Sequence, residues 1–178
     1  NRVSVLSTGL NIDPIVVVQK AVPGLYNDIS SYEIDTYLAE TAAALTVEHP
    51  DYSYLAARIK VNSLHKETPG FVIATKNLFE DGLLREDYYK KVLDNADEIE
   101  SVIDYDKDYT FDYFALTTLI RAYLLKFDNK TIERPQDLWM RVTLTVSGKE
   151  FNLEKIKETY NSLSSGMYTH ATPTLFNS

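Results

Sequence analysis

Three polar residues in the first 70 positions have the types and spacing to hold a ligand: Ser31, Asp35 and Lys66. Ser31 and Asp35 are four positions apart in a segment of helical periodicity, so their side chains share one helix face. Ile34 and Leu38 mark a different, apolar face. Lys66 ends the next predicted helix. A hydroxyl, a carboxylate and an ammonium across a helix pair could hold a nucleotide, with Lys66 on phosphate and Asp35 on ribose or base.

The same three residues also fit an ordinary solvated helix surface with a chance ion pair. Such surface pairs contribute only about 0–1 kcal/mol to stability. The residues alone leave both interpretations open.

Thr172 is a second candidate for ligand contact. It precedes Pro173 in the stretch "MYTHATPTLFNS", and the proline favours an extended conformation at Thr172 and removes one backbone donor. A hydroxyl held in this way can hydrogen-bond a phosphate or ribose oxygen. The alternative is that Thr172 caps a turn or pairs with nearby backbone.

The residue types that most often serve as nucleophiles or metal ligands are few in this chain. The chain has no cysteine, and its three histidines, His49, His65 and His170, lie far apart without a ligand pair at helical spacing. We therefore expect neither a catalytic residue nor a metal site in these residues. Arg121 and Tyr123 fall in an otherwise apolar predicted helix, where a core or inter-domain contact is the expected role.

Composition limits the partners. Of 178 residues 44% are hydrophobic, the formal net charge is −8 and the pI is about 4.9. This charge disfavours nucleic acid binding. No apolar run reaches the roughly 18 residues that a membrane span needs. We expect a cytoplasmic protein that contacts neither nucleic acid nor membrane.

The periodicity predicts a mainly α-helical chain. Asp13-Pro14 and a Ser30/Glu33 capping box mark helix starts, Asp128-Asn129 marks a turn, and Gly166 marks a helix end. The predicted helices cover approximately residues 15–22, 30–49, 50–68, 71–84, 85–103, 135–146 and 153–165. The segment 104–126 starts acidic and turns apolar, and its helix-face candidates are Leu116, Leu119, Ile120 and Leu124.

Three stretches together carry a family resemblance. "RPQDLWMRV" and "THATPTLFN" follow "LAARI" and "LHK" in the same order as in the large, catalytic subunit of class I ribonucleotide reductases. The resemblance extends from Gly9 to Ser178. It implies a partial ATP-cone in residues 1–70, a helical domain in residues 71–166, and in residues 167–178 a short strand that begins the catalytic α/β barrel.

The resemblance also implies roles for the candidate residues. Ser31, Asp35 and Lys66 correspond to effector-binding positions for ATP or dATP, and Thr172 corresponds to a substrate contact. The β-hairpin that opens the family's ATP-cone has no counterpart in these residues, so we expect weak ATP binding by this segment.

The parent enzyme implied by the resemblance reduces ribonucleoside diphosphates to deoxyribonucleotides, which supply DNA replication, by thiyl-radical chemistry. It depends on the metal-radical cofactor of a small subunit and forms oligomers of large subunits. Its catalytic cysteines are expected beyond Ser178, so these residues alone are not expected to be catalytic. Two rival interpretations remain: a stand-alone ATP/dATP-sensing helical module, and a structural helical interaction protein.

Overall fold

The computed structural model describes residues 2–178, whose contacts separate into two compact units. Unit 1 contains residues 2–67 and 108–118, and unit 2 contains residues 68–107 and 119–178. The division after Glu67 lies beside the break expected at residues 68–70. Residues 108–118 pack with unit 1, whereas the sequence analysis grouped them with residues 71–166.

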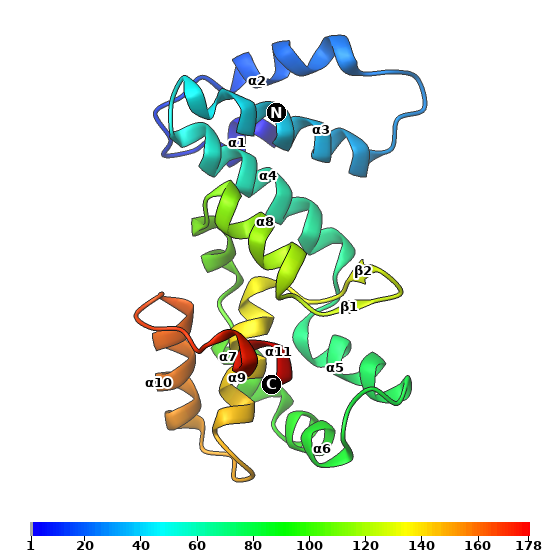
Figure 1. Ribbon diagram of the computed structural model, residues 1–178, viewed down its shortest axis with the longest axis vertical. Coiled ribbons are helices and arrows are strands. Elements are labelled where there is room, and N and C mark those ends of the chain that lie inside the picture. The colour runs from blue at the N-terminus through cyan, green and yellow to red at the C-terminus, as the bar shows by residue number, and fades with distance from the viewer. Residues whose placement is uncertain (1) are drawn as a thin grey trace. The chain divides into compact units, whose positions relative to one another are not determined.

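Unit 1 is built from helices. They are α1 (Arg2–Leu6), α2 (Pro14–Ala21), the 3-10 turn η1 (Val22–Gly24), α3 (Ser31–Ala44), the 3-10 turn η2 (Leu45–Val47), α4 (Asp51–Glu67) and the first part of α8 (Tyr113–Ala122). Helices α3 and α4 lie side by side in this unit (Figure 1).

Local chemistry explains where these helices begin. The Asp13 side chain accepts the N–H of Ile15 at the start of α2, and Pro14 occupies the first turn, where no intrahelical donor is lost. The predicted capping box of α3 is confirmed, because Ser30 and Glu33 each accept the other's backbone N–H. Capping therefore fixes both helix starts independently of tertiary packing.

Apolar residues from several helices form the core of unit 1. The buried members are Val3, Val17, Ala39, Ala42, Leu45, Tyr52, Leu55, Ala56 and Ile59. Alanine on α3 allows its backbone to approach α4 closely, and this approach places polar residues of the two helices within reach of each other.

Unit 2 combines helices with one short hairpin. Its elements are α5 (Phe71–Glu80), α6 (Glu86–Asp94), α7 (Ala96–Val102), the antiparallel strands β1 (Lys126–Phe127) and β2 (Lys130–Thr131), α9 (Pro135–Val146), α10 (Leu153–Ser164) and α11 (Thr172–Asn177). The 3-10 turn η3 (Tyr105–Thr110) and α8 each have residues in both units.

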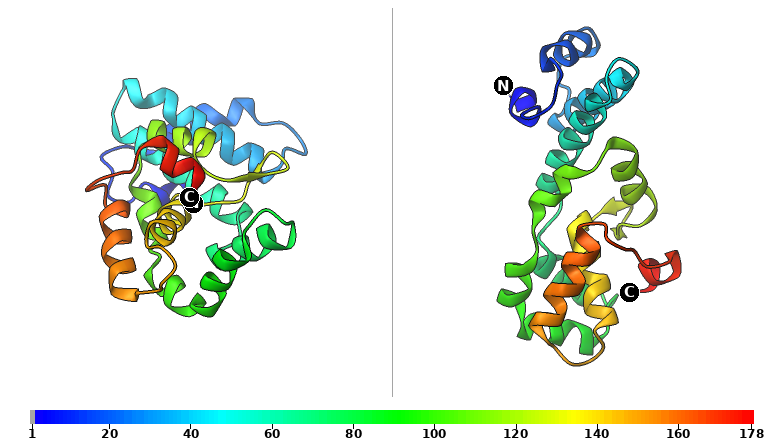
Figure 2. Two further views of the ribbon diagram at one scale, coloured as in Figure 1. Left: turned by 60° about the horizontal axis from the view of Figure 1, so that its bottom comes forward. Right: turned by 90° about the vertical axis from the view of Figure 1, so that its left-hand side faces the viewer.

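Helix α9 is the centre of unit 2. Every residue from Pro135 to Leu144 is buried, which is typical of a helix covered on all sides. Helix α10 packs beside it, as Figure 2 shows from a second direction, and α11 contacts it as well. The buried Tyr160 hydroxyl of α10 donates to the Gln136 side chain of α9 at 2.9 Å, so this polar group is paired inside the core.

Two details of the sequence prediction are wrong. The segment 85–103 is interrupted at Asn95, whose side chain donates to the Lys91 carbonyl at 2.8 Å and competes with the helical ladder. The expected C-terminal strand is helix α11. Thr174 and Leu175 both donate their N–H groups to the Ala171 carbonyl, and Pro173 is accommodated in the first turn. The extended residue is Ala171, one position before Thr172.

The prediction of a mainly α-helical chain is confirmed, because the two strands of the hairpin contain two residues each. Among the helices described, none combines the length and the apolar character that crossing a bilayer requires.

Candidate functional site

The first candidate site lies between α3 and α4 in unit 1. The Lys66 ammonium is 3.3 Å from Oδ2 of Asp35, and the Arg2 guanidinium pairs with Oδ1 of the same carboxylate. Asp35 is 2% exposed, whereas the side chains of Lys66 and Arg2 are 50% and 40% exposed. One buried negative charge thus holds two cations that still reach solvent.

The sequence analysis placed Asp35 off the apolar face of its helix, and in the structure it meets two cations there, although it is buried. Close packing of α3 on α4 buries the carboxylate, and the two cations compensate for the loss of hydration. Ser31 remains exposed at the start of α3, one turn before Asp35. The structure therefore joins Asp35 to Lys66 directly and leaves Ser31 at the open end of the same helix face.

The chemistry of this cluster suits an anion. Lys66 and Arg2 bring two positive charges to one exposed edge, and within residues 2–178 both pair with the same carboxylate, that of Asp35. A phosphate at this edge would gain charge-assisted hydrogen bonds. Among residues 2–178, no group of three or more His, Asp or Glu side chains is arranged to hold a metal ion.

The second candidate site is the N-terminal end of α11 in unit 2. Thr172 is exposed at the first position of this helix, and its hydroxyl oxygen lies 3.4 Å from the Tyr123 hydroxyl. The Tyr123 ring stacks on the Phe176 ring with centroids 5.1 Å apart and an interplanar angle of 15°. The structure thus gives Thr172 a polar neighbour that the sequence did not suggest.

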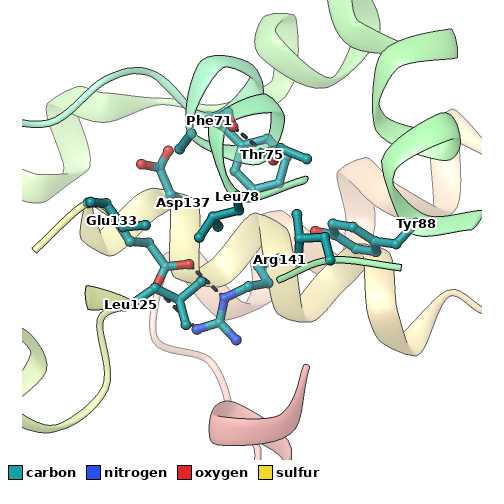
Figure 3. A pocket seen from close by; sticks show the side chains of 11 residues that line it. Phe71, Thr75, Leu78, Tyr88, Leu125, Glu133, Asp137 and Arg141 are labelled. Carbon is teal, nitrogen blue, oxygen red and sulfur yellow. Dashed lines mark hydrogen bonds and ion pairs between the residues drawn. The ribbon is translucent and has the colours of Figure 1, made fainter. Parts of the chain in front are cut away.

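Arg141, which forms a buried ion pair with Glu133, connects α9 to α11. The Arg141 guanidinium contacts the Glu133 carboxylate at 2.6 Å and 3.1 Å, and both side chains are 5% exposed. Arg141 also donates to the carbonyls of Leu175 and Ser178 at 3.2 Å and 2.7 Å. Figure 3 shows the guanidinium turned toward Glu133. The end of α11 is therefore held by a charged donor that is itself fixed in the core.

The cavity beside this ion pair is small. Its volume is about 20 Å³, and its lining includes Phe71, Tyr88, Glu133 and Asp137 (Figure 3). That space matches a single water molecule, whereas ligand cavities measure about 300–1,000 Å³. This cavity is a structural feature of the core and not a nucleotide site.

Asp137 has the most perturbed carboxyl near this cavity. Burial raises the pKa of Asp137 to about 7, although the Tyr105 hydroxyl and the Arg134 N–H both donate to its oxygens and oppose that rise. The carboxyl accepts at 2.7 Å from Tyr105 and at 2.9 Å from Arg134. These bonds join the start of α9 to η3.

Sequence reasoning missed three residues that build these sites. Arg2 lacked a signal beyond being the first cation of the chain, and Glu133 and Arg141 flank the apolar part of α9 at a spacing that predicts no contact. Tyr123 was expected in a core or inter-domain contact and instead meets Thr172. Arg121, expected in the same role, is exposed.

The comparisons with known proteins agree with this helical architecture. Residues 109–178 match the protein family described as "Ribonucleotide reductase, all-alpha domain". This segment includes α8 to α11 and therefore Tyr123, Arg141 and Thr172.

Whole-chain comparisons give the same result. The chain is 40% identical to the ribonucleoside-diphosphate reductase large chain of Schizosaccharomyces pombe, over 99% of this chain and 23% of the relative. It is 41% identical to the large subunit of Caenorhabditis elegans over 100% of this chain and 24% of the relative, and 40% identical to that of Variola virus over 99% and 24%. The chain thus spans about a quarter of the length of these relatives.

These similarities confirm the resemblance inferred from the sequence: residues 109–178 are similar to the ribonucleotide reductase all-alpha domain, and the whole chain is similar to part of ribonucleoside-diphosphate reductase large subunits.

Proposed function

We propose that this chain is the N-terminal part of a ribonucleoside-diphosphate reductase large subunit. The observation that carries the proposal is about 40% identity to such subunits along essentially the whole chain. The parent protein would reduce ribonucleoside diphosphates to deoxyribonucleotides by thiyl-radical chemistry. These 178 residues contain no cysteine, so the radical and the reducing thiols would come from other parts of the parent protein.

In this proposal unit 1 contributes part of an ATP-cone. Lys66 and Arg2 supply positive charge for the effector phosphates, the buried Asp35 carboxylate holds both cations in place, and Ser31 adds a hydroxyl on the helix face of Asp35. The ion pair between Asp35 and Lys66 supports this assignment because the buried carboxylate holds the half-exposed ammonium in place. The proposed effectors are ATP and dATP.

Unit 2 would support the substrate. Thr172, at the exposed start of α11, is the proposed contact for the diphosphate or ribose of the substrate. Arg141 supports this role because its bonds to the Leu175 and Ser178 carbonyls fix the helix that carries Thr172.

The proposed partners are the small subunit, which supplies a metal-radical cofactor, and further copies of the large subunit. The proposed location is the cytoplasm.

Turnover by the full-length protein tests the proposal. Combined with its small subunit and a reductant, the full-length protein should convert a ribonucleoside diphosphate to the deoxyribonucleotide, and Thr172→Ala should raise KM. Protein without turnover that still binds ATP and dATP would favour the alternative of a nucleotide-sensing module. Protein with neither property would leave only a structural role.

A further inference from the structure

The Tyr123 hydroxyl lies within hydrogen-bonding distance of the Thr172 hydroxyl. Tyr123 directly follows α8, and its backbone N–H donates to the Leu119 carbonyl at 2.8 Å. The next residue, Leu124, is 5% exposed and donates its N–H to the same carbonyl. The backbone that carries Tyr123 is therefore anchored on both sides of the peptide bond, while its half-buried side chain reaches α11.

The Tyr123 side chain contacts two residues on one face of α11. Thr172 and Phe176 are four positions apart and so lie above one another on the helix. The Tyr123 hydroxyl meets Thr172 at 3.4 Å, and its ring stacks on Phe176. Offset aromatic stacking contributes about 0.5–1.5 kcal/mol beyond area burial, so the ring contact holds the hydroxyl in place even though the hydrogen bond is long.

Separate contacts fix the backbone of α11. Leu175 is 6% exposed, and its carbonyl accepts from Arg141. The helix position therefore does not depend on the Tyr123 hydroxyl. The Tyr123 hydroxyl can instead orient the Thr172 hydroxyl.

We propose that Tyr123 is a positioning residue that directs the Thr172 hydroxyl toward an oxygen of the bound nucleoside diphosphate. The inference rests on the proposed substrate contact of Thr172. When the Tyr123 hydroxyl donates to the Thr172 oxygen, the Thr172 proton points away from the tyrosine. That proton is then available to an accepting oxygen of the phosphate or ribose.

A double-mutant cycle in the full-length protein with its small subunit tests the inference. Tyr123→Phe retains the ring stack and removes only the hydroxyl. It should raise KM for a ribonucleoside diphosphate about 2- to 10-fold, the range of one net hydrogen bond, with kcat unchanged because binding of ground and transition states is affected equally. Thr172→Ala should raise KM at least as much. The double variant should match Thr172→Ala alone.

Serine at position 172 provides the conservative control. Thr172→Ser retains the hydroxyl, so Tyr123→Phe should raise KM in that background by the same factor as in the wild-type protein. Tyr89→Phe is the matched control at a distance, since Tyr89 also stacks on a phenylalanine, Phe79, at 3.9 Å. Tyr89→Phe should leave KM unchanged.

The outcomes separate the inference from the proposed function. An unchanged KM in Tyr123→Phe together with a raised KM in Thr172→Ala overturns the positioning role and leaves the substrate contact in place. Multiplied effects in the double variant also overturn it, since Tyr123 would then act independently of Thr172. An unchanged KM in Thr172→Ala refutes the contact and the inference together, while turnover itself still supports the reductase assignment.

Discussion

The carboxylate of Asp35 and the ammonium of Lys66 lie 3.3 Å apart, across the contact between α3 and α4. A charge as buried as that of Asp35 is costly unless it is paired, and the second pairing with Arg2 gives the carboxylate a cation on each oxygen. The same arrangement keeps Lys66 half-exposed and close to the helix face that carries Ser31.

Lys66→Ala in the full-length protein should weaken ATP and dATP binding about tenfold or more, because a charge-assisted hydrogen bond to phosphate is lost. Isothermal titration calorimetry with both nucleotides measures this change. Lys20→Ala is the matched control, since Lys20 also pairs with a carboxylate, Glu48, at 2.8 Å, but both side chains are exposed. Equal affinities for the wild-type protein and Lys66→Ala would exclude Lys66 from the effector site.

Glu133→Gln should lower the free energy of unfolding by about 3–5 kcal/mol, because it leaves the Arg141 guanidinium buried without a counter-charge. Urea unfolding followed by circular dichroism measures the loss. Replacing Glu133 and Arg141 together with apolar residues should cost less than Glu133→Gln alone, since no unpaired charge remains. A double replacement that costs as much as Glu133→Gln, or more, would mean that the buried Arg141 charge carries no penalty when its partner is removed.

Lys76→Met is the control for that comparison. Lys76 lies 3.9 Å from Glu80 on the exposed face of α5, so its loss should leave the unfolding midpoint nearly unchanged. A shift as large as that of Glu133→Gln would show that the assay does not distinguish buried from exposed ion pairs.

Features set by neighbouring residues were predictable from the sequence. Asp13, Ser30 and Asn152 accept backbone N–H groups at the predicted helix starts, and the turn at Asp128-Asn129 has the positive φ values, 47° and 61°, that a two-residue hairpin needs. In each case the deciding interaction lies within four residues, so the pattern contains the necessary information.

Features set by distant packing were not predictable. Burial of Asp35 depends on α4, and the pairing of Tyr123 with Thr172 joins positions 49 residues apart. The C-terminal segment was expected to be a strand because the family resemblance implied one. In the structure this segment is a helix, so most of its backbone groups bond within the segment. Arg141 donates to the Leu175 carbonyl near the helix end.

Gly166→Ala should lower the free energy of unfolding by about 1 kcal/mol, because Gly166 ends α10 with a φ of 72° that is strained for residues with a Cβ atom. Thermal unfolding measures the change. Ser165→Ala, at the exposed neighbouring position, is the control and should have a smaller effect. Equal stabilities of Gly166→Ala and wild type would show that the turn relaxes without cost.

Asp137 should make stability fall as pH rises toward neutrality. Burial raises the pKa of its carboxyl from 3.8 to about 7 in the folded chain. Between these values the unfolded chain releases a proton that the folded chain retains. The stabilising contribution of protonated Asp137 is therefore complete below about pH 4 and is lost as pH rises to about 7, with a slope of up to about 1.4 kcal/mol per unit.

Asp137→Asn removes this titration while it retains a neutral side chain of similar shape. Urea unfolding of both proteins from about pH 4 to about pH 8 should show the variant gaining stability relative to wild type up to about pH 7, with a constant difference above it. Asp97→Asn, an exposed change on α7, should follow the wild-type curve. A difference between Asp137→Asn and wild type that is the same at every pH would mean that the Asp137 carboxyl titrates alike in the folded and unfolded chains. In that case the bonds from Tyr105 and Arg134 would offset the cost of burial completely.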